Sequence, residues 1–227
     1  MQVQEVLTRL KSLSNQNNRE GMAKFGINID SALGISIYTL RSVAKEIGRN
    51  HELATQLWNS GIHEARILAS MIGEPARVTE NLMEKWVNDF NSWDICDQVC
   101  SNYFDRTPFA YHKAIEWSAR RKEFVKRAGF VLMATLSVHD KRADDQQFIQ
   151  FFPIIMREST DERNYVKKAV NWALRQIGKR NRELNERAVQ IALEIQKMDT
   201  KSARWIATNA LRELTSVKVQ SRLRKRK

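Results

Sequence analysis

Apolar residues recur at helical spacing along almost the whole chain, whereas runs that alternate apolar and polar residues, as in a half-buried strand, are nearly absent. At the start of the chain, for example, Val3, Val6 and Leu10 fall on one face of a helix. Gly and Pro are scarce, at 8 and 3 of 227 residues, which argues against the frequent tight turns of an all-β sandwich or barrel. The pattern therefore predicts an all-α fold.

The expected helices follow one another with connectors of only a few residues, so successive helices should pack antiparallel. Serial helix pairs are typical of a HEAT-like helical-repeat solenoid, an α-α superhelix whose concave groove would here be basic. The pairs resemble one another only weakly in sequence, so a compact all-α bundle is the alternative. We expect one domain over residues 1–227, with a basic tail at about 216–227 whose order the sequence leaves open. Beyond residue 77, the expected helices cover residues 78–90, 92–104, 107–119, 123–139, 145–158, 161–179, 182–197 and 200–214.

Several of these expected helices begin at a residue that can cap them. Side-chain oxygens stand at the starts formed by Ser92, Thr107, Asp161 and Thr200. Pro108 is expected at a first helical position, where its missing amide costs nothing.

The formal net charge of the chain is +12, and its distribution is uneven. Residues 1–113 carry 12 Lys and Arg against 13 Asp and Glu, whereas residues 114–227 carry 26 against 13. A surface this basic concentrates polyanions and speeds their association, which favours nucleic acid as the partner. The alternative is a solvated, solubilising face, which is often all that a basic tail provides.

Signals for a membrane or for secretion are missing. No apolar run approaches the roughly 18 residues of a transmembrane helix, and the first residues lack the basic start and apolar core of a signal peptide. Two cysteines, Cys96 and Cys100, cannot form a disulfide framework, so we expect a cytoplasmic protein without a membrane partner. They share a helix face but have no nearby His, so we expect buried thiols and no metal site.

The segment from Asn91 to Cys100 is the most informative one for chemistry. Positions four apart stack on one face of a helix, so Trp93 lies beside Asp97. Asp94 falls in the first turn, where a carboxylate favours the positive end of the helix, and thus has a structural explanation. Asp97 lies in mid-helix on the face of an indole and has no such explanation. The alternative is an exposed Asp next to a core Trp.

A second cluster lies in the expected helix 161–179, where a basic stripe surrounds an indole: Lys168, Trp172, Arg175 and Lys179. Cationic side chains that flank an aromatic ring are the pattern expected for holding nucleic acid. The alternative is a Trp packed under the stems of Lys and Arg side chains. A third basic cluster, residues 120–122 with 126 and 127, would grip backbone phosphate or be a solvated turn.

The remaining tryptophans and ionisable residues have structural interpretations. Four tryptophans sit on apolar stripes and are assigned to the core: Trp58, Trp86, Trp117 and Trp205. Glu64 and Arg66 are interpreted as ordinary surface charges, and the four scattered His residues as capping or surface groups.

Three segments together resemble the AlkD-type DNA alkylation repair family of DNA glycosylases: Ser-Trp-Asp-x-x-Asp at 92–97, Lys-Arg-Ala at 126–128 and Lys-Ala-x-x-Trp-x-Leu-Arg at 168–175. Their order and spacing agree with the family, and the similarity spans about residues 22–214. The resemblance implies a HEAT-like solenoid whose concave, basic face cradles duplex DNA. It also implies excision of cationic N3- or N7-alkylated purines without flipping the base into a pocket, and without a metal or an organic cofactor.

The resemblance also implies roles for single residues. Asp97 matches the catalytic carboxylate of the family, and Trp93 and Trp172 match the indoles that contact the sugar of the damaged nucleotide. Arg127 matches an arginine beside the backbone of the lesion. Arg175 matches the motif as well and would hold a phosphate.

Other positions expected to bind DNA are looser matches. Phe25 stands where the family can have Tyr, so the ring is kept and the hydroxyl is lost. Arg41 and Lys45, four apart in an expected helix, resemble positions that touch the DNA backbone, and Lys168 belongs to the basic stripe. A further departure is the single Trp at position 93, where some relatives carry a doubled one.

These residue types suit the chemistry of base excision. An alkylated purine is already cationic and leaves readily, so positive charge rises on the deoxyribose in an oxocarbenium-like transition state. A carboxylate aimed at the sugar stabilises this charge and can orient the attacking water. Indole faces beside the sugar add cation–π attraction of about 1–2 kcal/mol each when desolvated.

Two other functions remain open from the sequence: a non-catalytic HEAT-like protein that binds duplex or branched DNA, and a HEAT-type protein-interaction module. The first would show salt-dependent DNA affinity without excision, and the second would show little DNA affinity. The expected partner is duplex DNA that contains alkylated purines, which a groove-wrapping solenoid can bind as a monomer.

Overall fold

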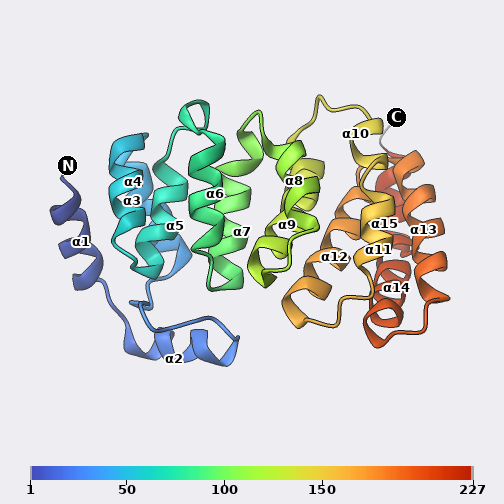
Figure 1. Ribbon diagram of the computed structural model, residues 1–227, viewed down its shortest axis with the longest axis horizontal. Helices are drawn as coiled ribbons and strands as arrows, with labels where there is room; N and C mark the ends of the chain where they lie inside the picture. Colours follow the sequence, from blue (N-terminus) through green and yellow to red (C-terminus); the bar gives the residue numbers. More distant parts are fainter. Residues whose placement is uncertain (1, 226–227) are drawn as a thin grey trace. The chain divides into compact units, whose positions relative to one another are not determined.

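The computed structural model describes residues 2–225, and every regular element in this part of the chain is helical (Figure 1). The prediction of an all-α fold is therefore confirmed. The chain divides into two compact units, Met1–Thr107 and Pro108–Lys227. Within the described residues, no helix has the length and apolar character needed to cross a membrane.

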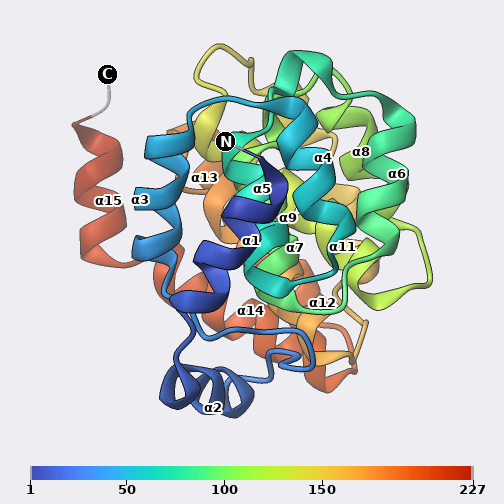
Figure 2. The ribbon, with the colours of Figure 1, turned by 90° about the vertical axis from the view of Figure 1, so that its left-hand side faces the viewer.

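In its described residues, the first unit contains seven α-helices and two short 3-10 turns: α1 (Val3–Ser12), α2 (Gln16–Lys24), α3 (Ile37–Ile47), α4 (His51–Asn59), α5 (His63–Ile72), η1 (Pro75–Arg77), α6 (Glu80–Asn88), α7 (Trp93–Asn102) and η2 (Phe104–Arg106). Helix α5 has the most partners and contacts α1, α3, α4 and α7. Figure 2 shows α1 in front of α5 and α2 below both. Helix α2 buries none of its residues, so packing in the hydrophobic core does not hold this helix in place.

The core of the first unit is built around stacked aromatic rings. The rings of Trp58 and Trp86 are parallel, with centroids 4.0 Å apart, and Tyr103 packs against Trp86. Both indoles are buried, which confirms their assignment to the core. Arg66 is not an ordinary surface charge, because its guanidinium lies 5.2 Å from the Trp58 ring and donates to the carbonyl of Asp89.

Glu64 also corrects the sequence interpretation, because its carboxylate is 1% exposed. It accepts hydrogen bonds from the backbone amides of Leu33, Gly34 and Ile35, at 2.7–3.2 Å. Gly34 has a φ of +79°, and a Cβ there would lie 2.1 Å from the carbonyl oxygen of Asn15. Glu64 therefore fixes the connection from α2 to α3 against α5.

Up to residue 225, where the described part of the chain ends, the second unit contains eight helices: α8 (Ala110–Ser118), α9 (Glu123–His139), α10 (Gln146–Ile149), α11 (Phe152–Glu158), α12 (Asn164–Ile177), α13 (Arg182–Gln196), α14 (Lys201–Leu214) and α15 (Val217–Arg224). Helix α9 packs against α8 and α12, α12 also packs against α14, and α14 pairs with α13. Trp117 is buried in α8, as predicted. The assignment of Trp205 to the core is wrong, because this residue of α14 is 37% exposed.

Helices α9, α12 and α14 stack in a fixed register. Arg127 of α9 donates to the carbonyl of Tyr165 in α12, and Arg175 of α12 pairs with Glu213 of α14, both across 38 residues. Lys167 lies over the ring of Trp205 at the same offset. Because two contacts eight residues apart in α12 meet partners eight residues apart in α14, these two helices run parallel. Stacking of equivalent helices at a constant period is the packing of a repeat protein.

One predicted helix is interrupted. Residues 145–158 were expected to be continuous, but α10 ends at Ile149 and α11 begins at Phe152. Pro153 has no backbone N–H, and its ring collides with the carbonyl four residues earlier, which is that of Ile149. The helix therefore has to end there and restart.

Helix starts were predicted with mixed success. Thr200 caps α14 as expected and accepts a hydrogen bond from the amide of Ala203. Helix α8 begins only at Ala110, so Thr107 and Pro108 precede it. Asp161 also lies before its helix, which begins at Asn164.

The segment expected as a basic tail contains α15. Val219 and Leu223 are its buried residues, and Gln220 donates to the carbonyl of Leu214 at 2.7 Å. The last two residues of that segment, Arg226 and Lys227, lie outside the described residues.

Candidate functional site

Helix α7 carries Trp93 and Asp97, and its first turn is fixed by a pair formed by the buried His63 and the half-buried Asp94. His63 Nε2 lies 2.7 Å from Asp94 Oδ2, and Ser92 donates to the other oxygen of Asp94 at 2.6 Å. His63 is 1% exposed, so its interpretation as a capping or surface group is wrong. Burial raises the pKa of Asp94, but the hydrogen bonds from His63 and Ser92 outweigh it and leave the pKa below its usual value. Asp94 thus joins α7 to α5 through His63, in addition to its favourable position at the positive end of the helix, which was expected from the sequence.

Trp93, the first residue of α7, is joined to the end of α2. Its indole N–H donates to the main-chain carbonyl of Phe25 at 3.1 Å. The Phe25 side chain is 76% exposed, while Trp93 is half-buried. The structure therefore brings two of the predicted site residues together and leaves both rings accessible.

Asp97 follows Trp93 by one turn on the same side of α7 and is half-buried. The other side of the helix faces the core, where Cys96 and Cys100 are fully buried. Burial raises the pKa of the Cys100 thiol well above its usual value. The interpretation of these cysteines as buried thiols is confirmed, and the side of α7 that bears Asp97 is the one open to solvent.

Helix α3 exposes a second group of predicted residues. Arg41 and Lys45 are exposed and lie one turn apart. Tyr38, which was not among the residues predicted to bind DNA, is 78% exposed three residues before Arg41. Its place beside the two cations could have been predicted from the sequence, since Tyr38, Arg41 and Lys45 follow the i, i+3, i+7 spacing of one helix face.

Helix α12 presents the basic stripe of the second unit. Lys168 is exposed and Trp172 is half-buried, whereas Ala169, Val170 and Ala173 beside them are buried. The stripe therefore lies on the side of α12 that is accessible to solvent.

Arg175 belongs to this stripe but is already paired. Its guanidinium and the ammonium of Lys179 both bind the carboxylate of Glu213. Partial burial raises the pKa of Glu213, but the two cations outweigh it and keep the pKa below its usual value. The sequence did not reveal this partner because it lies 38 residues from Arg175.

Arg127 is buried and holds α9 to α12. It is 6% exposed, and its Nη1 donates to the main-chain carbonyl of Tyr165 at 2.6 Å. Its position on α9, next to the helix that bears Lys168 and Trp172, makes it a support for that helix.

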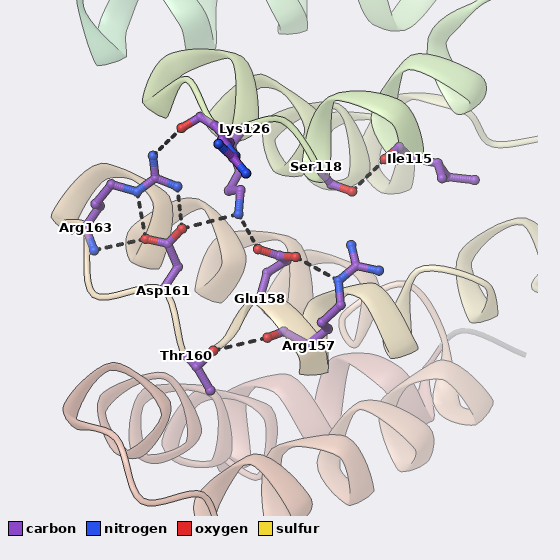
Figure 3. Close-up of polar contacts among 9 residues, drawn as sticks. Ile115, Ser118, Lys126, Arg157, Glu158, Thr160, Asp161 and Arg163 are labelled. Atoms are coloured by element: carbon purple, nitrogen blue, oxygen red, sulfur yellow. Dashed lines mark hydrogen bonds and ion pairs between the residues drawn. The ribbon is translucent and has the colours of Figure 1, made fainter.

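One member of the third basic cluster, Lys126, lies in an ionic network (Figure 3). Lys126 binds Glu158 and lies 3.4 Å from Asp161, and Arg163 holds the same Asp161 through two nitrogens. Arg163 also donates to the carbonyl of Arg121 at 2.6 Å. Lys126 is therefore neither a solvated charge in a turn nor available to bind a phosphate. Its ion pairs connect α9 to the end of α11 and to the segment between α11 and α12.

Comparison with known proteins gives the following matches. A family model described as DNA alkylation repair enzyme matches residues 6–214. Among curated proteins, none matches this sequence. A solved structure from a new family of proteins related to the HEAT-like repeat DNA glycosylases, with affinity for branched DNA structures, matches with a TM-score of 0.80. That match has 21% identity and covers 98% of this chain and 96% of the other, which shows that the fold is of the HEAT-like repeat type.

Two further solved structures are less similar. An engineered protein matches with a TM-score of 0.42 and 13% identity, covering 78% of this chain and 90% of that one. A designed armadillo repeat protein in complex with a (KR)4 peptide matches with a TM-score of 0.37 and 12% identity, covering 82% and 79%.

Proposed function

Because this chain belongs to the family of DNA alkylation repair enzymes, we propose that it is a monofunctional DNA glycosylase. Its substrates would be cationic N3- or N7-alkylated purines in duplex DNA, excised without flipping the base into a pocket. The observation that carries this proposal is on α7, where the half-buried carboxylate of Asp97 lies one turn from the half-buried indole of Trp93. A carboxylate and an aromatic face side by side on an accessible surface are suited to a sugar that becomes cationic.

The reaction replaces the bond from C1′ to the purine nitrogen with a bond from C1′ to a water oxygen. The cationic purine leaves with the electron pair of the broken bond and becomes neutral, so it needs no proton from the protein. Asp97 stabilises the positive charge that rises on the deoxyribose, orients the water and accepts one of its protons. Trp93 presents its ring to the same sugar, and its bond to the Phe25 carbonyl fixes the ring.

Most of the remaining predicted residues would bind DNA. We assign Trp172 to contact with the sugar of the damaged nucleotide and Lys168 to a phosphate, since both lie on the solvent-accessible side of α12. Arg175 would hold a phosphate by exchanging or sharing its partner Glu213. Arg127 acts by supporting α12 through Tyr165.

In the first unit, the exposed cations of α3 would also hold phosphates. Arg41 and Lys45 are both open to solvent, one turn apart. Phe25 would offer its exposed ring to the DNA.

Binding of DNA without turnover is the second candidate. It is supported by Phe25, which has no hydroxyl to offer, and by the engagement of Arg175 with Glu213. A fold of this type also occurs in a protein with affinity for branched DNA structures. Under this candidate, the same surfaces would bind duplex or branched DNA and leave the glycosidic bond intact.

One experiment separates the two candidates. The purified protein is incubated with methylated duplex DNA, and released 7-methylguanine and 3-methyladenine are quantified, while binding to the same DNA is measured at several salt concentrations. Release above the uncatalysed rate supports the glycosylase. Salt-dependent binding without release supports the binding protein. If the chain neither binds nor excises, both candidates fail.

A further inference from the structure

An exposed indole lies on α14, outside the predicted site. Trp205 is 37% exposed, although tryptophan is one of the most apolar large side chains. Its neighbours Ile206 and Ala207 are fully buried, so the helix already has a complete apolar face without it. The ring of Trp205 is therefore accessible beside the buried face of α14.

The exposed face of α14 is polar and cationic around the ring. Trp205, Thr208, Asn209 and Arg212 follow i, i+3, i+4, i+7 spacing and form one stripe. Asn209 donates to the carbonyl of Trp205 at 2.9 Å and accepts from Arg212 at 2.8 Å. Arg212 is thus held one turn beyond Asn209 on the indole side of the helix.

Helix α12 adds a second cation to the ring. The ammonium of Lys167 lies 5.3 Å from the Trp205 centroid. Arg175, which shares the stripe of Trp172, pairs with Glu213 of α14, so α12 and α14 run parallel and side by side. The exposed Trp205 and the half-buried Trp172 therefore belong to neighbouring parallel helices, each with cations around it.

We propose that Trp205 is a stacking platform for an unpaired nucleotide of a DNA strand, with Lys167 and Arg212 binding the adjacent phosphates. Base pairs inside a duplex cover one another's faces, whereas an unpaired base offers its full face to an indole. Lys167 has a flexible stem and can move from the ring to a phosphate. The proposal rests on the proposed function in one respect only, namely that the chain binds DNA.

The test compares two DNA molecules that differ in one feature: a blunt duplex, and the same duplex with a short single-stranded extension. Their affinities are measured by fluorescence anisotropy for the wild type, Trp205→Ala and Trp205→Phe. The control is Leu193→Ala, which removes another side chain that is 37% exposed, from α13. Urea unfolding of each variant shows that it is folded.

The expected result is specific to the extended DNA. Trp205→Ala weakens binding of the extended duplex by about 5- to 100-fold and that of the blunt duplex by less than about twofold. Trp205→Phe keeps most of the affinity, and Leu193→Ala changes neither. Equal losses on both DNA molecules, or no loss on either, overturn the proposal while DNA binding by the wild type stands. If the wild type binds neither DNA, the proposed function fails together with it.

Discussion

The indole N–H of Trp93 donates to the main-chain carbonyl of Phe25 at 3.1 Å, which joins α7 to the end of α2. The contact uses the backbone of Phe25 and leaves its ring 76% exposed. Trp93 is therefore positioned by a hydrogen bond that does not depend on which side chain stands at position 25.

The two residues should respond differently to substitution. Phe25→Ala keeps the carbonyl and removes only an exposed ring, so the free energy of unfolding should change by less than about 0.5 kcal/mol. Trp93→Phe removes the donor and should cost about 0.5–1.5 kcal/mol. Urea unfolding of both variants checks this. Equal losses of stability would contradict the role of the backbone contact.

Asp94→Asn should destabilise the protein by about 2–3 kcal/mol at neutral pH, because a hydrogen bond to a charged, buried group is lost. The pKa of Asp94 is lowered in the folded state, so its stabilisation is present above the unfolded pKa, which is about 3.9, and is lost as the pH falls through the lower folded value. The difference in unfolding free energy between wild type and variant should therefore shrink below about pH 4. Urea unfolding from pH 7 to pH 3 measures this, and a difference that grows on acidification would refute it.

Glu64→Gln should be more damaging than a typical surface change. The carboxylate accepts three backbone amides, and a glutamine would turn an N–H₂ group toward some of these donors, at a cost of about 2–4 kcal/mol. The matched control is Glu52→Gln, which removes an exposed, solvent-screened carboxylate paired with Arg77 and should lower the melting temperature much less. Thermal unfolding of both variants compares them. Similar melting temperatures would show that Glu64 does not hold the connection between α2 and α3.

Glu213→Gln should tighten DNA binding. The substitution removes the carboxylate that Arg175 and Lys179 share, so both cations can bind phosphates, and affinity at low salt should rise about 3- to 10-fold with a steeper salt dependence. Glu186→Gln changes the net charge equally but removes a carboxylate paired with Arg182 on α13. It should have a smaller effect in the same titration. If both variants bind alike, only net charge matters.

Much of the fold could be predicted from the sequence, because its helices depend on local periodicity. Buried tryptophans such as Trp58 and Trp117 and the cap at Thr200 followed from the same local patterns. The break between α10 and α11 could also have been predicted, since Pro153 forbids a hydrogen bond to Ile149.

The errors concern residues whose environment is set by distant segments. Glu64 is buried because three amides some 30 positions earlier point at it, and nothing near it in sequence shows this. Arg175 is engaged because the parallel register brings Glu213 beside it. Trp205 was expected on an apolar stripe, but it shares its helix face with polar residues, and Lys167 from another helix lies over its ring. Periodicity defines a face, and tertiary packing decides what covers it.

The most direct test of the central claim is the single-turnover excision rate of Asp97→Asn on an oligonucleotide duplex with one 7-methylguanine. The substitution keeps the shape of the side chain and removes its charge. We expect a rate about a hundredfold to a thousandfold below that of the wild type, with DNA affinity unchanged. An excision rate equal to that of the wild type at the same affinity would contradict the assignment of Asp97 as the carboxylate that stabilises the sugar.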